Sequence, residues 1–369
     1  MIPVNAPLLM GNEKKYLEEC IDSGWISSEG PFVSRFEEEF ASYVGRKHGV
    51  SVTNGTAALE AAVCALELPR NSEVIVPSFT IISCASAILR NGLTPVPVDC
   101  DIKTFNSRAA HFEAAITERT SAIMVVHIYG LPCDMDDILA LAKKYNLKII
   151  EDAAEVIGQE YRGKRCGTFG DLSTFSFYPN KHITTGEGGM VVTDDKHLAD
   201  RLRSLRNLCF KPEKRFVHEE LGWNFRMTNL QAALGLAQLE QIENFVAKKK
   251  MIGRSYNEKL ASVEGVSLPL AATEFAENIY WVYSIVLDPD RSVGAEFVMS
   301  RLAEYKIGTR PFFYPLHKQP VLQSHLDPNQ NCRNSELLSE YGFYLPSGLG
   351  LKDSDIEFVC EKLIEVLSQ

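Results

Sequence analysis

The chain has 369 residues, 45% hydrophobic and 23% charged, which fits a globular protein with one large domain and a smaller companion. Its net charge of −10 argues against broad binding to nucleic acid or anionic membranes. Nine scattered cysteines without a Cys-x-x-Cys pair indicate reduced thiols, and the eight histidines form no ligand-spaced group. The start of the chain lacks a basic, apolar leader, and no later apolar run reaches membrane-spanning length. We therefore expect a cytoplasmic protein without a metal site.

Short apolar segments alternate with helical patterns from about residue 45 to 205. Continuous apolar strands separated by helices are typical of a mainly parallel sheet covered on both faces. The expected helices are Thr56–Leu66, Ile82–Leu89 and Met135–Tyr145. The expected strands are Glu73–Pro77, Thr94–Val98, Ala122–His127, Lys148–Asp152, Ser173–Phe177 and Gly189–Val192.

The pattern changes near residue 230. Gln231–Leu260 is expected as one long helix, straight or bent, and is followed by strand Ile279–Leu287 and helices Ala295–Tyr305 and Asp353–Leu367. These elements predict a large α/β domain at residues 1–230, including an N-terminal segment, and a smaller α+β domain at residues 231–369.

Lys181 is the most informative residue of the chain. It lies between an aromatic strand end at Phe177 and the glycine-rich run that closes at Gly189. An amine on a flexible stem with little room for solvent can lose its proton and attack a carbonyl, which gives a Schiff base. The alternative is an ordinary surface lysine on a loop, and three further segments argue against it.

The first segment is Thr53–Thr56, between an apolar strand and a helix. Gly55 allows the backbone to approach a ligand closely, and the N–H groups that open the helix, with the Thr56 hydroxyl, suit a phosphate. An ordinary capped helix start explains the segment equally well. The chain contains neither a P-loop nor a Gly-x-Gly-x-x-Gly turn after its first strand.

The second segment is Glu151–Glu155, at the carboxyl end of an apolar strand, where open α/β sheets bind ligands. A buried carboxylate at Asp152 requires a cationic partner. The ring nitrogen of pyridoxal phosphate is such a partner, because an aspartate keeps it protonated. The alternative is a cap for the next segment. Glu155 faces either the same site or solvent.

The third segment is Gly222–Met227, where Asn224 and Arg226 stand next to aromatic residues and could reach an anion. Packing at the entry to the following helix is the alternative. Taken together, the segments provide a phosphate cradle, a partner for a ring nitrogen and a lysine able to form a Schiff base.

These residues resemble the DegT/DnrJ/EryC1/StrS family of nucleotide-sugar aminotransferases, which have the fold-type I, aspartate-aminotransferase-like fold. The resemblance extends over nearly the whole chain, and the run Lys-x-x-Thr-Thr-Gly-Glu-Gly-Gly that begins at Lys181 is its most specific part. The other matching runs are Ser23–Ser27, Asn54–Leu59, Pro77–Thr80, Val126–Gly130, Glu151–Ala154, Gly167–Asp171 and Gly222–Met227.

The resemblance implies that pyridoxal 5′-phosphate is the cofactor. Lys181 would then form the Schiff base and move the proton, and Asp152 would pair with the ring nitrogen. Glu155 occupies a position, often glutamine in the family, that approaches the phenolic oxygen. Ile81 stands where the family commonly places an aromatic residue against the ring, so aromatic stacking is lost there. The cofactor phosphate would be held by Gly55, Thr56, Ser176 and, from a neighbouring subunit, Asn224.

The resemblance also implies a homodimer with shared active sites, and Trp25, Arg226, Tyr314 and His317 as substrate-binding residues. A packed or solvent-facing histidine is the alternative for His317. The runs Met1–Val4, His218–Gly222, Thr228–Ala233 and Thr309–His317 most resemble family members that aminate C4 of GDP-4-keto-6-deoxy-mannose with glutamate as amino donor.

Three other functions compete with amino transfer. A related branch of sugar 3-dehydratases carries histidine where Lys181 stands here. A regulatory protein that retained the fold would be expected to have lost Lys181 or Asp152, and both are present. A nicotinamide-dependent oxidoreductase would need the glycine fingerprint that is missing. Amino transfer to a UDP- or dTDP-linked keto sugar stays open as well, because no motif distinguishes guanine from uracil or thymine.

Overall fold

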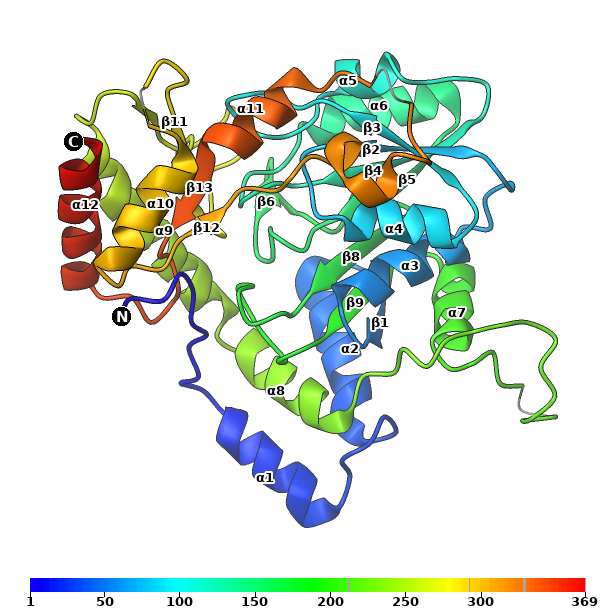
Figure 1. The fold of residues 1–369 in the computed structure, drawn as a ribbon. Helices are drawn as coiled ribbons and strands as arrows, with labels where there is room; N and C mark the ends of the chain where they lie inside the picture. Colours follow the sequence, from blue (N-terminus) through cyan, green and yellow to red (C-terminus); the bar gives the residue numbers. More distant parts are fainter. Residues whose placement is uncertain (212, 292, 328–329, 369) are drawn as a thin grey trace.

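A seven-stranded sheet forms the centre of the larger part of the protein (Figure 1). The computed structural model describes residues 1–211, 213–291, 293–327 and 330–368. Four neighbouring strand pairs of this sheet are parallel, and only β9 runs antiparallel to its neighbours, which confirms the expected mainly parallel sheet. In spatial order the strands are β1 (His48–Val52), β9 (Gly189–Thr193), β8 (Leu172–Ser176), β5 (Lys148–Asp152), β4 (Thr120–Val126), β2 (Glu73–Pro77) and β3 (Thr94–Val98).

Helices cover both faces of this sheet because its strands are apolar on both sides. Along β4, Ile123 and Val125 pack into one core, whereas Met124 and Val126 pack into the other. The first core lies under α1 (Glu13–Ser23), α2 (Pro31–Val44), α6 (Met135–Tyr145) and α8 (Asn229–Leu239). The second lies under α3 (Gly55–Ala65), α4 (Ser83–Arg90) and α7 (Lys196–Leu205).

A smaller antiparallel sheet follows in the C-terminal part of the chain. Its order is β10 (Val266–Ser267), β11 (Tyr283–Leu287), β13 (Gly342–Leu345) and β12 (Arg310–Pro311). A third core joins this sheet to α9 (Ile242–Leu260), α10 (Ala295–Glu304) and α12 (Asp353–Leu367). The remaining elements are α5 (Ala109–Glu113), α11 (Arg333–Tyr341), the hairpin β6 (Glu160–Tyr161) and β7 (Lys164–Arg165), and the 3₁₀ turns Leu316–Lys318 and Pro320–Leu322.

Helix α9 connects the two parts of the protein. Phe245 near its start packs into the first large core, and Tyr256 near its end packs into the core of the small sheet. The N-terminus also reaches the small sheet, since Ile2 pairs with Ile307 (Figure 1). The expected division of the chain at residue 230 stays a prediction.

Two expected elements differ from the structure. The helix expected at Gln231–Leu260 is two helices, because α8 ends at Leu239 and α9 begins at Ile242. The strand expected from Ile279 begins only at Tyr283. Tyr280 has a left-handed backbone with φ of 50°, which takes the chain out of extended geometry just before the strand.

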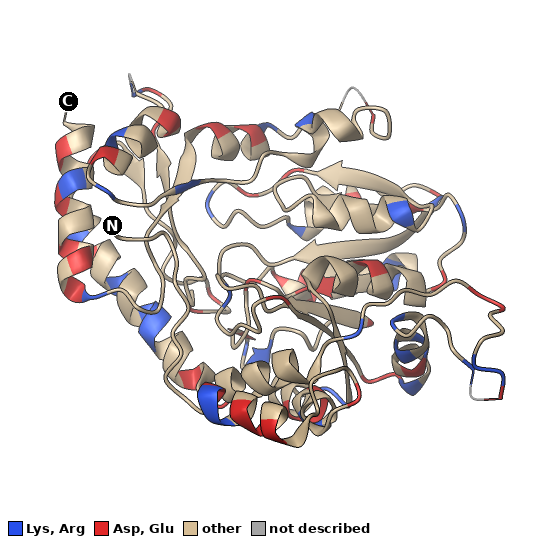
Figure 2. Cartoon of the chain, turned by 60° about the horizontal axis from the view of Figure 1, so that its bottom comes forward, with Lys and Arg blue, Asp and Glu red and all other residues tan. Residues whose placement is uncertain are grey.

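Charged side chains lie mainly on helices and loops, where lysine or arginine and acidic residues are interspersed (Figure 2). The strands of the large sheet carry few of them. Among the described residues, no helix is both long and apolar enough to cross a bilayer.

Candidate active site

A cavity of about 790 Å³ opens at the carboxyl ends of the parallel strands of the large sheet. It brings together residues from β5, β8, the start of α3 and the loop between β8 and β9, as expected at the switch points of such sheets. Predicted site residues that line it are Gly55, Thr56, Ile81, Asp152, Glu155, Ser176, Lys181 and Tyr314.

Lys181 lies in the loop between β8 and β9, with 10% of its side chain exposed. Its Nζ is 3.8 Å from Glu155 Oε1 and 3.9 Å from the ring centroid of Trp281. Burial lowers the pKa of the Lys181 amine, against the attraction of the Glu155 and Asp152 carboxylates. A lowered pKa increases the fraction of free amine, which is the nucleophilic form.

Asp152 ends β5 with its carboxylate buried. Oδ1 accepts the N–H of Ala154 at 3.1 Å, and among the residues that the structure describes Oδ2 accepts only the Cys84 thiol, at 3.6 Å. Burial raises the pKa of Asp152, and the positive charge of Lys181 opposes this effect. A buried carboxylate with such weak partners is well placed to bind a cationic group that enters the cavity.

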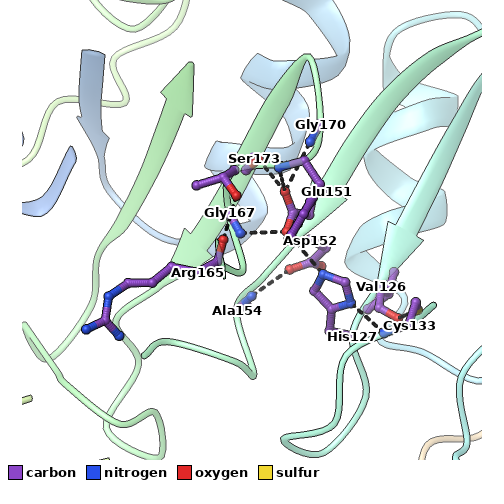
Figure 3. Close-up of polar contacts among 12 residues, drawn as sticks. Val126, His127, Cys133, Glu151, Asp152, Ala154, Arg165, Gly167, Gly170 and Ser173 are labelled. Carbon is purple, nitrogen blue, oxygen red and sulfur yellow. Dashed lines mark hydrogen bonds and ion pairs between the residues drawn. The ribbon is translucent and has the colours of Figure 1, made fainter. Parts of the chain in front are cut away.

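Asp152 is held in place by a buried network around its neighbour Glu151 (Figure 3). The Glu151 carboxylate accepts bonds from the Ser173 hydroxyl at 2.8 Å and from His127 Nε2 at 3.1 Å. It also accepts the backbone N–H groups of Gly167, Phe169 and Gly170. Although burial alone would raise the pKa of Glu151, the His127 bond and these N–H groups lower it to about 2.

The same network accounts for a cluster in which polar atoms of His127, Glu151 and Cys166 lie within 4.8 Å of one another. His127 Nδ1 accepts the N–H of Cys133 at 3.0 Å, so its proton is on Nε2 and points at Glu151. Burial raises the pKa of Cys166 well above its usual value, which keeps the thiol protonated. The cluster therefore acts as a hydrogen-bonded support for the carboxyl end of β5.

The opposite end of the cavity is built around the start of α3. The Asn54 side chain accepts the N–H of Ala57 at 2.8 Å and caps the helix, while the Thr56 and Ser83 hydroxyls share a 2.8 Å hydrogen bond. A Cβ on Gly55 would lie 2.7 Å from Cβ of Ser176, so only glycine fits there. The helix start and its hydroxyls form a cradle for an anion.

Glu155 follows β5 and is 6% exposed. It accepts the N–H of Tyr129 at 2.9 Å. Burial raises its pKa to about 7, although Lys181 attracts the charged form. Glu155 therefore keeps its proton to a higher pH than an exposed glutamate, and in the protonated form it can donate to an oxygen anion. Ile81, 47% exposed, presents an aliphatic side chain to the same cavity.

Four predicted residues do not line this cavity in one subunit. Trp25 is 49% exposed, and Asn224 is exposed with its Oδ1 bonded to Nε of Arg226. His317 is 7% exposed; its Nδ1 is bonded to Ser78 Oγ at 2.7 Å and its Nε2 to Glu336 at 2.9 Å. The His317 ring is therefore packed inside the protein, where its two hydrogen bonds hold the preceding segment, Thr309–Leu316, in place.

The cavity also contains residues that the sequence did not single out. Its aromatic wall is formed by Tyr178, Trp281, Phe312, Phe313 and Tyr344, and Arg90 and Arg310 add positive charge. Arg310, Phe312 and Phe313 lie in the Thr309–His317 run that carries part of the family resemblance, so that run was the available signal. No spacing or composition marks Trp281, which enters from the loop before β11.

Comparison with known proteins extends these observations. The model of the DegT/DnrJ/EryC1/StrS aminotransferase family matches residues 8–364. The chain belongs to this family. It is 44% identical to GDP-perosamine synthase of Caulobacter vibrioides (99% of this chain, 98% of that one) and 42% identical to GDP-perosamine synthase of Escherichia coli O157:H7 (100% and 99%). The structure of DesI in the presence of its TDP-sugar product superposes with a TM-score of 0.91 at 30% identity, covering 100% of this chain and 93% of that one.

As a member of the DegT/DnrJ/EryC1/StrS family, the protein is a pyridoxal-phosphate-dependent enzyme that transfers an amino group to a nucleotide-linked sugar. The geometry of its cavity fits that cofactor at both ends. The weakly partnered, buried carboxylate of Asp152 suits a protonated ring nitrogen, and the cradle at Gly55, Thr56 and Ser176 suits a phosphate. Lys181 lines the same cavity, where its amine can reach a carbonyl of the bound group.

Proposed function

We propose that the protein transfers the amino group of glutamate to C4 of GDP-4-keto-6-deoxy-mannose and so makes GDP-perosamine. The observation that carries this proposal is the identity of 44% and 42% to two GDP-perosamine synthases over nearly the whole length of each chain. The relative known with a TDP-sugar product is less similar, at 30%.

The proposed reaction has two half-reactions, one with glutamate and one with the keto sugar, and both use the same residues. Bound pyridoxal phosphate supplies an electron sink that stabilises negative charge on the reacting carbon. Glutamate first leaves its amino group at the site and departs as 2-oxoglutarate; the keto sugar then enters and takes the amino group. Lys181 accepts a proton from one carbon and returns it to another in each half. Asp152 holds the ring nitrogen charged, and protonated Glu155 donates to the phenolic oxygen.

Arg310 is the residue best suited to bind the negative groups of both substrates. Of the cations lining the cavity, Lys181 is near Glu155 and Arg90 is 3.5 Å from Glu60. Within the described part of the chain, Arg310 has no carboxylate at ion-pair distance, and its exposed side chain lies beside Tyr344. A carboxylate of glutamate and the diphosphate of the sugar nucleotide both suit a guanidinium that has no carboxylate partner among the described residues.

We further propose a homodimer in which each subunit completes the partner's site. The segment between α7 and α8 extends away from the rest of the subunit (Figure 1). Its Phe216 and Leu221 are 81% and 90% exposed, and the exposure of such large apolar side chains to water is unfavourable in a monomer. Asn224 and Arg226 follow directly on this segment, so pairing would carry them towards the partner's cofactor phosphate and substrate.

A panel of sugar nucleotides tests the substrate assignment. Purified enzyme is given glutamate and a GDP-, UDP- or dTDP-linked 4-keto-6-deoxy sugar, and kcat/KM is measured for each. We expect the highest value for the GDP sugar and ping-pong kinetics. Preference for a UDP or dTDP sugar would refute the GDP assignment and leave amino transfer intact. Loss of a sugar hydroxyl without gain of an amino group would indicate the dehydratase alternative.

A further inference from the structure

The indole of Trp281 lies against the amine of Lys181. Nζ is 3.9 Å from the centroid of the ring, and the amine has Glu155 Oε1 at 3.8 Å as its nearest charged partner. Trp281 is 3% exposed and lines the cavity together with Lys181. A cation this close to an indole face, shielded from water, is stabilised by the negative potential of the ring.

Two hydrogen bonds hold Trp281 in this position. Its Nε1 donates to the carbonyl of Asn180, the residue directly before Lys181, at 2.7 Å. Its own carbonyl accepts a bond from Lys249 Nζ at 2.8 Å, and the same Nζ binds the carbonyl of Ser347 at 2.6 Å. The Trp281 ring is thus bonded to the loop that carries Lys181, and the Trp281 backbone is bonded through Lys249 to helix α9.

Four other titratable groups interact electrostatically with the Lys181 amine: Asp152, Glu155, Cys84 and His182. The Asp152 and Glu155 carboxylates attract the charged amine, but each also serves the cofactor. Burial raises the pKa of Cys84 well above its usual value, and burial lowers the pKa of His182 well below its own, so both are neutral. Trp281 differs from all four because its ring face stabilises a cation and takes up no proton itself.

We propose that Trp281 is a positioning residue that stabilises the ammonium form of Lys181 while the lysine is detached from the cofactor. Lys181 must take a proton from the substrate carbon, hold it, and return it; the proton count is unchanged over the step. The indole face keeps the protonated amine in place between the two carbons without competing for the proton. This role rests on amino transfer through Lys181 and is independent of the nucleotide.

The test measures the charge of Lys181 in the enzyme treated with glutamate, which frees the lysine from the cofactor. Phenyl isothiocyanate, an uncharged reagent that reacts with free amines, is added at a series of pH values. Mass spectrometry of the peptide containing Lys181 then gives the rate. The pH midpoint of this rate reports the charge of the amine, whereas its plateau reports access to it.

We expect Trp281→Leu to move the midpoint down by about 0.4 to 1.5 pH units, the equivalent of an indole–ammonium contact. Trp281→Phe, which keeps a weaker ring face, should give a smaller downward shift, and also serves if the leucine variant does not fold. Phe313→Leu, which alters the same wall at a ring not placed over Lys181, should leave the midpoint unchanged.

An unchanged or raised midpoint in Trp281→Leu would overturn the proposal. Equal shifts in the phenylalanine and leucine variants would overturn it too, because they would trace the effect to the lost bond to Asn180. The readout needs no sugar nucleotide, so an error in the proposed substrate would appear in the panel of keto sugars and leave these midpoints as they are.

Discussion

Glu155→Gln should remove a pH dependence from the stability of the enzyme without its cofactor. Glutamate ordinarily titrates near pH 4.5, whereas burial raises the pKa of Glu155 to about 7 in the folded chain. Between these values the folded state binds more protons than the unfolded state. The free energy of unfolding therefore falls as the pH rises through this window, and the stabilising contribution of the protonated carboxyl is gone above pH 7.

The size of the effect follows from the two pKa values. Moving a pKa from 4.5 to about 7 corresponds to about 3 kcal/mol, most of which is lost between pH 5 and pH 8. Glu155 is 6% exposed, so solvent screens little of this. Glutamine can accept the same hydrogen bond from the Tyr129 N–H but does not titrate, so its profile should lack this decline.

Urea unfolding at pH 5, 6, 7 and 8, at one fixed protein concentration, measures the free energy of unfolding of wild type and Glu155→Gln. The control is Glu118→Gln, which makes the same change on the exposed surface. The stability difference between wild type and Glu155→Gln should change by roughly 2 to 3 kcal/mol across the range, and that for the control should stay constant. Parallel profiles for all three proteins would show that Glu155 is ionised throughout and that the reasoning is wrong.

Four further predictions address the chemistry and the assembly. Lys181→Ala should bind the cofactor without the yellow absorbance of the attached form and lose nearly all turnover; turnover like wild type would rule out its role. Asp152→Asn should lower kcat by about tenfold or more, since one pKa unit lost on the ring nitrogen is worth about 1.4 kcal/mol, and a change in KM alone would assign it elsewhere. Subunits with Lys181→Ala, mixed with subunits altered at Asn224, should regain activity in hybrid dimers, and verified exchange without any gain would refute shared sites. His317→Ala should weaken sugar use more than the glutamate half-reaction by loosening the neighbouring Tyr314, which lines the cavity, whereas equal losses in both would contradict this.

The positions of several predicted site residues in the fold could be read from their local sequence, whereas their binding roles stay predictions. Gly55 and Asp152 stand at strand and helix ends that the apolar pattern located within a few residues, so their placement at one sheet edge followed from the parallel order of the strands. Lys181 was recognised from the glycine-rich run beside it.

What the sequence could not provide depends on contacts between distant segments. Trp281 was placed inside an expected strand, and only the left-handed turn at Tyr280 and its packing against Lys181 take it out of the sheet. The break between α8 and α9 has no proline or glycine to mark it: Glu240 and Gln241 separate two helices that pack into the same core. The packing of His317 could not be foreseen because its hydrogen-bond partners, Ser78 and Glu336, are remote in sequence; its role in substrate binding stays a prediction.

Helix α9 packs against the small sheet and also bonds to Trp281. Lys249 is seven residues beyond the first residue of α9, about 10 Å along the helix, and its Nζ donates a hydrogen bond to the carbonyl of Trp281. A displacement of α9 relative to the large sheet would therefore move the indole beside Lys181, so the environment of the Lys181 amine depends on where α9 lies.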